Sequence, residues 1–265
     1  MSESVTVSID GHVAVVTLNR PDKANAVSME MFDALGDVGE RLAAERSVRA
    51  VVLQGAGGNF CAGIDVAVFA QDDVGIDASW LAPGDRSPAN RFQRAAYVWR
   101  ELPAPVICAI NGVAYGAGLQ ISLGADIRYA AADARLSIME TKWGLIPDLA
   151  ISTTLRDILP ADRVKELAWT GRVVDAKEAL SLGLITELHD DPQAAAMRMA
   201  QAICARSPDA VQAMKKLVNS AWRMTEAEAL ALEAKLQLGV LQGENQREAV
   251  LANLQKREPD FSDIR

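Results

Sequence analysis

The chain has 265 residues, 50% of them hydrophobic, and a formal net charge of −8. This length can bury one substantial core, so the composition excludes a disordered chain. The acidic balance, without clusters of lysine or arginine, also argues against a nucleic-acid partner, since such proteins bind phosphates through clustered basic side chains.

Cysteine content and the first residues of the chain indicate its compartment. The three cysteines are odd in number and widely spaced in apolar surroundings, which favours reduced core thiols over disulfides or a metal site. The chain does not open with a basic region followed by an apolar stretch, and no apolar run is long enough to span a membrane. We therefore expect a cytoplasmic protein without a membrane span.

The first two thirds of the chain alternate strand and helix patterns. This rhythm is typical of α/β proteins, in which helices cover parallel strands. In chain order, the predicted elements are a β-hairpin over residues 5–17 with its turn at Asp10-Gly11, a helix from the N-cap Ser28, a strand over 50–53, a helical segment over 91–102 and a strand over 106–110. In the first helix, apolar residues recur at helical spacing, at Met31, Phe32, Leu35, Val38 and Leu42.

Residues 71–90 interrupt this rhythm. They contain four aspartates, two glycines and two prolines, with only scattered apolar residues. Such a composition predicts an irregular loop, which could act as a lid.

The last third of the chain is predicted to be almost entirely helical. Helix starts are indicated at Asp175, Ser207 and Thr225, the first and third with the spacing of a capping box. The final segment also carries more leucines than a short helix pair can bury, namely Leu230, Leu232, Leu236, Leu238 and Leu241. We expect these residues to mediate oligomerisation.

Two glycine-rich turns follow predicted strands, at residues 60–65 and 111–118. Glycine allows the main chain to approach a ligand, and the start of a helix offers N–H groups without intrahelical partners. Two such turns could form an oxyanion hole, although close packing alone also explains a glycine-rich turn. The spacing of glycines in the second turn does not match a dinucleotide-binding fingerprint.

Four motifs occur in order along the chain: LNRPDKANAV at 18–27, FCAGID at 60–65, NGVAYGAG at 111–118, and Met139-Glu140 followed by Gly144-Leu-Ile-Pro147. With these motifs the chain resembles the crotonase (enoyl-CoA hydratase/isomerase) superfamily over nearly its whole length. The resemblance implies an α/β fold built as a spiral of ββα units, with two perpendicular sheets over residues 1–200 and a C-terminal helical region over 201–265. It also implies a homotrimer or a dimer of trimers.

The resemblance further implies an acyl-coenzyme A substrate, with no metal, flavin or nicotinamide cofactor. It places the oxyanion donors on the backbone N–H groups of Ile64 and Ala117, the latter where the family usually has glycine. Residues implied to grip the coenzyme A and the substrate are Lys23, Ala24, Ala26, Ala62, Gly63, Asp65 and Gly116.

Three polar residues remain as candidates to handle a proton. Hydratases of the family carry two glutamates, and here the first of these positions is Gln120 while the second is Glu140. A glutamine cannot take up a proton near neutral pH, which disfavours paired-carboxylate hydration. Asp148, eight residues after Glu140, gives a spacing that resembles the dienoyl-CoA isomerase branch.

We therefore expect Glu140 and Asp148 to relay a proton during double-bond migration, with Gln120 orienting the substrate or a water molecule. The alternatives are hydration, hydrolysis or displacement with Asp148 as nucleophile, and acyl-CoA binding without catalysis. Purely structural roles also fit, as a packed amide for Gln120 and as capping or ion-paired groups for the two acids. The acyl pocket is expected near Trp80, Phe92, Trp99 and Trp143.

Overall fold

The computed structural model describes residues 3–68, 78–84 and 87–264. Its strands form a six-stranded sheet in the order β1-β2-β3-β4-β6-β9 and a three-stranded sheet in the order β5-β7-β8. The strands of the large sheet are β1 (Val5–Asp10), β2 (Val13–Leu18), β3 (Ala50–Gly55), β4 (Val106–Ile110), β6 (Ile127–Ala130) and β9 (Glu187–Leu188). Those of the small sheet are β5 (Val113–Tyr115), β7 (Arg135–Ser137) and β8 (Val174–Asp175).

Successive turns of the chain deliver one strand to each sheet. β4 pairs in parallel with β3 and β6, whereas β5, which follows β4 after two residues, pairs in parallel with β7. The next turn repeats this step, with β6 in the large sheet and β7 in the small one. This is the ββα spiral that the resemblance to the crotonase superfamily implies, and it brings the segments between the two sheets close together.

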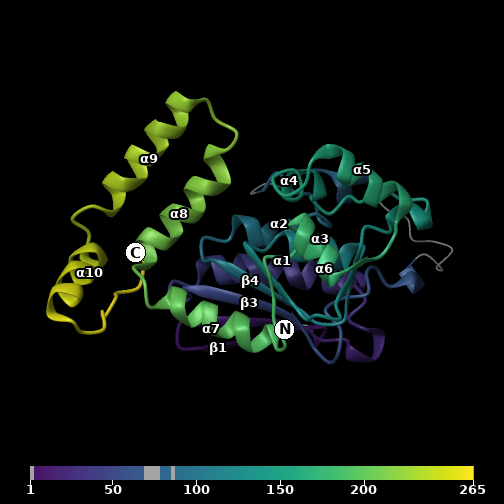
Figure 1. Cartoon of the computed structure of the whole chain (residues 1–265), viewed down its shortest axis with the longest axis horizontal. Coiled ribbons are helices and arrows are strands. Elements are labelled where there is room, and N and C mark those ends of the chain that lie inside the picture. Colours follow the sequence, from purple (N-terminus) through teal and green to yellow (C-terminus); the bar gives the residue numbers. More distant parts are fainter. Residues whose placement is uncertain (1–2, 69–77, 85–86, 265) are drawn as a thin grey trace.

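The helices cover these sheets and extend the chain (Figure 1). They are α1 (Met29–Ala44), α2 (Arg94–Glu101), α3 (Ala117–Leu123), α4 (Ile151–Thr154), α5 (Ala161–Thr170), α6 (Ala176–Leu182), α7 (Pro192–Cys204), α8 (Pro208–Ala221), α9 (Glu226–Val240) and α10 (Glu244–Gln255). Short 3₁₀ turns lie at η1 (Pro21–Lys23), η2 (Val66–Val68), η3 (Ala78–Leu81) and η4 (Glu140–Trp143).

Two buried clusters hold the fold together. The larger lies between the sheets and α1, α2 and α3, and it includes all five residues of the predicted helical stripe in α1. The smaller packs alanines of α7 against Val52, Ile107 and Tyr129 on the other face of the large sheet. Each fully buried aliphatic side chain contributes roughly 1.5–3 kcal/mol to stability.

The predicted helix starts are confirmed. Ser28 accepts a hydrogen bond from the Met31 N–H, and Asp175 accepts one from the Glu178 N–H. Thr225 and Glu228 form a complete capping box, whereas Ser207 makes no side-chain capping bond and its helix begins with Pro208. The predicted hairpin and the strand at 106–110 are also present, and the helix expected over 91–102 spans Arg94–Glu101.

Several short elements were not predicted from the sequence, among them β5 to β9, α4 and α5. Of the loop expected over 71–90, part lies outside the described residues, and the described part contains η3. Within the described ranges, no helix is both long and apolar enough to cross a bilayer.

The last three helices extend away from the sheets (Figure 1). Lys215 of α8 connects them to the body, because its ammonium donates to the carbonyl oxygens of Trp99 and Ala104 at 3.0 Å each and pairs with Asp126 at 2.7 Å. At the end of the chain, the Arg49 guanidinium donates to the Phe261 carbonyl oxygen at 2.6 Å.

Candidate active site

The segments that follow β2 and β3 lie side by side. The Val27 N–H donates to the Gly63 carbonyl oxygen at 2.8 Å, the Asp65 N–H donates to that of Val27 at 2.9 Å, and the Ala62 N–H donates to that of Ala24 at 2.9 Å. These bonds bring together most of the residues predicted to grip coenzyme A. Lys23, on the exposed turn η1, stands at the edge of the same segment.

An ion pair and a buried amide, neither of them predicted, fix this arrangement. The Arg20 guanidinium donates to the Asp65 carboxylate at 2.9 Å and to the Ala26 carbonyl oxygen at 2.6 Å, which lowers the pKa of Asp65. Asn25 is fully buried, and its amide donates to the Ala56 and Asn59 carbonyl oxygens. The Asp65 side chain therefore stabilises the loop, since both of its carboxylate oxygens accept hydrogen bonds, from Arg20 and from the Ala67 N–H.

The two glycine-rich turns meet in space. The Cys61 N–H donates to the Val113 carbonyl oxygen at 2.9 Å, and the Tyr115 N–H returns a bond to Cys61 at 3.0 Å. A side chain on Gly63 would place its Cβ 3.0 Å from the Tyr115 carbonyl oxygen and 4.0 Å from the Ala117 nitrogen. Glycine is required at position 63 for a second reason, since its φ of +102° is rarely adopted by other residues.

The N–H groups of Ile64 and Ala117 are available at this junction. In the Val27–Ile64 bridge the donors are Val27 and Asp65, so the Ile64 N–H is not used there. The Ala117 N–H, at the start of α3, likewise donates no hydrogen bond to another described residue. Ala117 is the first residue of α3 and does not have a positive φ, so its Cβ is compatible with the turn. The preceding residue, Gly116, is the one with a positive φ, of +50°.

Glu140 lies against the second turn. It begins η4, and its Oε1 atom accepts a hydrogen bond of 2.6 Å from the Gln120 side-chain nitrogen. A Cβ on Gly116 would be only 3.1 Å from the same oxygen. The Oε2 atom is buried and has no hydrogen-bond partner among the described residues. The carboxyl group thus borders the residue that precedes the Ala117 amide.

Asp148 lies on the loop between η4 and α4. The next residue, Leu149, donates its N–H to the Gln120 amide oxygen at 2.8 Å, so one glutamine contacts both Glu140 and the Asp148 loop. The Asp148 side chain remains exposed, but the surrounding protein still removes enough hydration to raise its pKa.

Burial is also the main reason why the pKa of Glu140 is raised, and the negative charge of Asp148 raises it further. Hydrogen bonds from the Glu140 backbone and from Gln120 oppose this shift. Both acids therefore hold a proton at a higher pH than ordinary carboxyl groups, a property that is common in residues of active sites.

The raised pKa of Glu140 has a consequence for stability. The folded protein binds this proton more tightly than the unfolded chain, so Glu140 costs stability as the pH rises above the unfolded pKa of about 4.3. We expect Glu140→Gln to raise the melting temperature at pH 8, with a smaller gain at pH 4.5. Thermal unfolding at both pH values measures this, with Glu45→Gln as control because the pKa of Glu45 is lowered. A gain that is larger at pH 4.5 contradicts the prediction.

The aromatic residues expected near the acyl chain lie in different surroundings. Trp99 does not line an open pocket as expected, because it is fully buried and its indole N–H donates to the Ala95 carbonyl oxygen at 2.9 Å. Of the other aromatic residues considered, Trp143 is 52% exposed on η4, and Trp80 packs edge-to-face on Phe92.

Cys61 contributes to the site through its main chain, which joins the two glycine-rich turns. All three cysteines are free, Cys61 and Cys108 are buried, and burial raises the pKa of Cys61 to about 12. Among the described residues, no group of three or more His, Cys, Asp or Glu is arranged to hold a metal ion.

Known proteins are similar to this chain over most of its length. A family model described as enoyl-CoA hydratase/isomerase matches residues 8–264. The enoyl-CoA hydratase EchA19 of Mycobacterium tuberculosis is 34% identical over 95% of this chain and 93% of its own length. The human mitochondrial Delta(3,5)-Delta(2,4)-dienoyl-CoA isomerase is 33% identical over 97% of this chain and 80% of its own length. The crystal structure of a putative enoyl-CoA hydratase from Streptomyces coelicolor A3(2) superimposes with a TM-score of 0.89 at 33% identity, covering 98% of this chain and 94% of that one.

Proposed function

The chain belongs to the enoyl-CoA hydratase/isomerase (crotonase) family of enzymes, and from this premise we propose that it moves a double bond within an unsaturated acyl-CoA. In this proposal the thioester oxygen is held by the N–H groups of Ile64 and Ala117. Glu140 and Asp148 transfer the proton, one removing it from a carbon of the acyl chain and the other delivering it to a second carbon.

The observation that carries the proposal is the combination of two acids of raised pKa with two backbone N–H groups that have no partner in the described part of the chain. The donors stabilise negative charge on the thioester oxygen when a proton leaves the neighbouring carbon, an effect worth about 2.7–4 kcal/mol for each donor. The acids supply the proton transfer. Burial is the main cause of the raised pKa of Glu140, and the negative charge of Asp148 adds a smaller rise.

Hydration is the second candidate, since relatives of similar identity carry the name hydratase. It is disfavoured by Gln120, which stands where hydratases of the family carry their first glutamate. Its amide oxygen and one N–H are bound by Leu149 and Glu140, which leaves a single N–H for a water molecule.

We also propose that coenzyme A binds along the adjoining segments 20–27 and 61–65. Residues assigned to this contact are Lys23, Ala24, Ala26, Ala62, Gly63, Asp65 and Gly116. The hydrogen bonds between the two segments support the assignment of residues 24–26 and 62–65, because they bring these residues together beside Ile64, whereas Gly116 lies on the other glycine-rich turn. Lys23 adds positive charge for the phosphates of the nucleotide.

A panel of substrates tests the proposed function. Purified protein is incubated with 2-enoyl-, 3-enoyl- and dienoyl-CoA thioesters of several chain lengths, and products are identified by liquid chromatography with mass spectrometry. Isomerisation leaves the mass unchanged, hydration adds one water, and hydrolysis releases free coenzyme A. An isomer as the main product supports the proposal, whereas water addition or thioester cleavage as the main reaction replaces it. Tight binding without any product identifies an acyl-CoA-binding protein.

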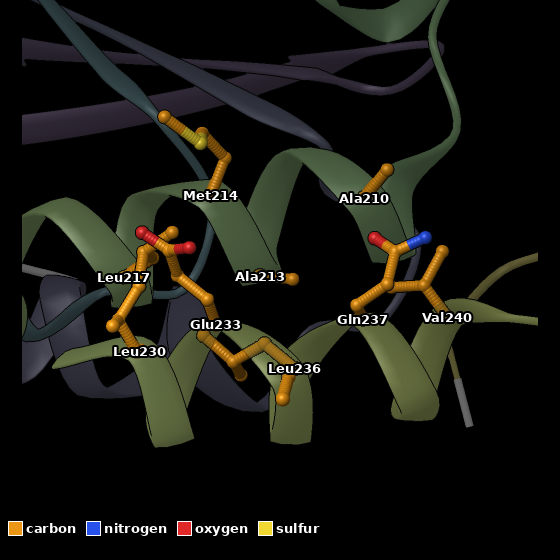
Figure 2. Close-up of a pocket in the computed structure, with 10 residues that line it drawn as sticks. Ala210, Ala213, Met214, Leu217, Leu230, Glu233, Leu236, Gln237 and Val240 are labelled. Atoms are coloured by element: carbon orange, nitrogen blue, oxygen red, sulfur yellow. The ribbon is translucent and has the colours of Figure 1, made fainter. Parts of the chain in front are cut away.

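The C-terminal helices support the proposal of a homotrimer or a dimer of trimers. Between α8 and α9 lies a groove of about 540 Å³, whose lining includes Met214, Leu217 and Leu230 (Figure 2). Leucines on α9 and α10 are strongly exposed, with Leu238 at 72% and Leu254 at 77%. Exposed apolar surface of this kind is typical of subunit interfaces.

A charge in this groove should weaken the assembly. We expect Leu230→Asp, at a position that is 63% exposed, to shift the protein toward monomers in sedimentation velocity. Leu230→Met keeps an apolar side chain and should leave the assembly unchanged. A wild-type chain that sediments as a monomer would exclude the proposed oligomer.

A further inference from the structure

We propose that Gln120 is a positioning residue, which directs the transferable proton of Glu140 to its Oε2 atom and holds the Asp148 loop at the same time. The inference rests on the proposed function in one respect, namely that the proton is exchanged with an acyl-CoA. It assigns to Gln120 a task other than orienting water or substrate.

The orientation of the Gln120 amide follows from its partners. The side chain is only 1% exposed, in the middle of α3, and its two polar atoms lie 2.8 Å from the Leu149 nitrogen and 2.6 Å from Glu140 Oε1. The Leu149 N–H can only donate, so the amide oxygen must face it. The amide NH₂ group therefore faces Glu140, and Oε1 is obliged to accept.

This bond favours one of the two positions for a proton on Glu140. A hydroxyl oxygen accepts a hydrogen bond less well than a carbonyl oxygen, so the amide N–H favours an unprotonated Oε1. The proton is consequently placed on Oε2, which is buried and has no partner among the described residues. Oε1 also packs over Gly116, so Oε2 is the carboxyl oxygen that has no hydrogen bond to a described residue, and we assign the exchange with a substrate to it.

The second bond of the amide ties the two acids together. Leu149 is buried, whereas Asp148 and the five residues 142–146 before Pro147 are exposed. The bond to Gln120 thus anchors the loop directly after Asp148, and the same side chain sets the position of Glu140. A shift of this amide would move both acids relative to the substrate.

The charged surroundings of Glu140 bear on any test by pH. Asp148 is the charged group that acts on its pKa, in the direction of a rise. On α5, which packs against η4, Glu166 pairs with Arg163 and Arg172. The remaining charged residues of these two elements are Lys142 on η4 and Asp162 and Lys165 on α5. Over α3, residues 117–123, the chain has no charged residue.

Gln120→Met tests the proposal, because methionine fills a similar volume without donor or acceptor. We expect the pKa of Glu140 to rise, since the bond from Gln120 lowers it. The pKa is followed by NMR of side-chain ¹³C-labelled glutamate, assigned with Glu140→Gln. We expect kcat to fall by on the order of 10²-fold while KM changes little, because misplacement by about 1 Å costs that much. The acid limb of kcat/KM should move to higher pH.

Two matched variants separate positioning from general packing. Ser122→Ala removes another buried polar side chain of α3, whose hydroxyl donates to the Leu119 carbonyl oxygen, and it should leave the Glu140 pKa and kcat unchanged. In Gln120→Glu, the protonated acid can donate to Glu140 and accept from Leu149. This variant should recover activity at low pH and lose it as the second carboxyl group ionises.

An unchanged Glu140 pKa in Gln120→Met, or a full kcat in that variant, overturns the proposal. So does an equal loss of kcat in Ser122→Ala, which would indicate packing alone. The NMR titration needs no turnover, so it tests the hydrogen bond even if the wild-type protein converts none of the acyl-CoA substrates.

Discussion

Replacing Glu140 with glutamine is expected to lower kcat for double-bond isomerisation by about 10²–10⁴-fold, the usual contribution of a positioned acid or base. Glutamine keeps the shape of the side chain, and its oxygen can still accept from Gln120. It cannot carry the proton to or from the substrate. Substrate binding should change little, because the proposed thioester contacts belong to the backbone of Ile64 and Ala117.

The measurement is the rate of product formation with the best substrate of the panel, together with binding of the same acyl-CoA by calorimetry. Asp148→Asn should show a loss of similar size. Glu45→Gln should not, because Glu45 lies at the C-terminal end of α1, binds Ser47 and has no role in the proposed proton transfer. Full activity in Glu140→Gln and Asp148→Asn would remove the proton relay from the mechanism.

Replacing Gly118 with alanine is expected to cost about 1–3 kcal/mol of stability, as other overpacked sites do. A Cβ at this position would lie 2.4 Å from the Cys61 carbonyl oxygen and 2.7 Å from the Cys61 Cβ. The first of these atoms is backbone and cannot rotate away. The turn that carries Ile64 must then move from the turn that carries Ala117, so activity should fall along with stability.

Urea unfolding followed by circular dichroism measures the loss of stability, and the isomerase assay measures the loss of activity. Gly239→Ala is the control, because a Cβ there meets nothing within 4 Å and the residue lies inside α9. That change should stabilise the helix by roughly 0.5–1 kcal/mol. A Gly118→Ala protein as stable and active as the wild type would show that the two turns are not in tight contact.

The sequence predicted the elements whose signals are local. The stripe of α1 and the capping box at Thr225 depend on residues within one or two turns of the helix, and both are present in the structure. The strands β5 and β7, of three residues each, are too short to show a period of two. They exist because the spiral places them beside each other, which is information that no short window contains.

The candidate site likewise has features that the sequence shows and features that depend on the fold. The glycine-rich turns are visible in the sequence, but only the resemblance to the crotonase family singles out Ile64 and Ala117. The contacts of Gln120 join residues 20 and 29 positions away, and the bond from Arg20 to Asp65 spans 45 positions. Such pairings are set by tertiary packing, so neither the positioning amide nor the ion pair could be inferred before the fold was known.

The anchoring of α8 has one more consequence. Lys215 holds the helix through a single ammonium surrounded by three oxygen atoms at fixed places. Apolar contacts have no preferred direction, whereas hydrogen bonds depend on both distance and angle. The three bonds of Lys215 therefore fix the orientation of α8 relative to the sheets, so a second subunit that binds the C-terminal helices would meet them in a defined orientation.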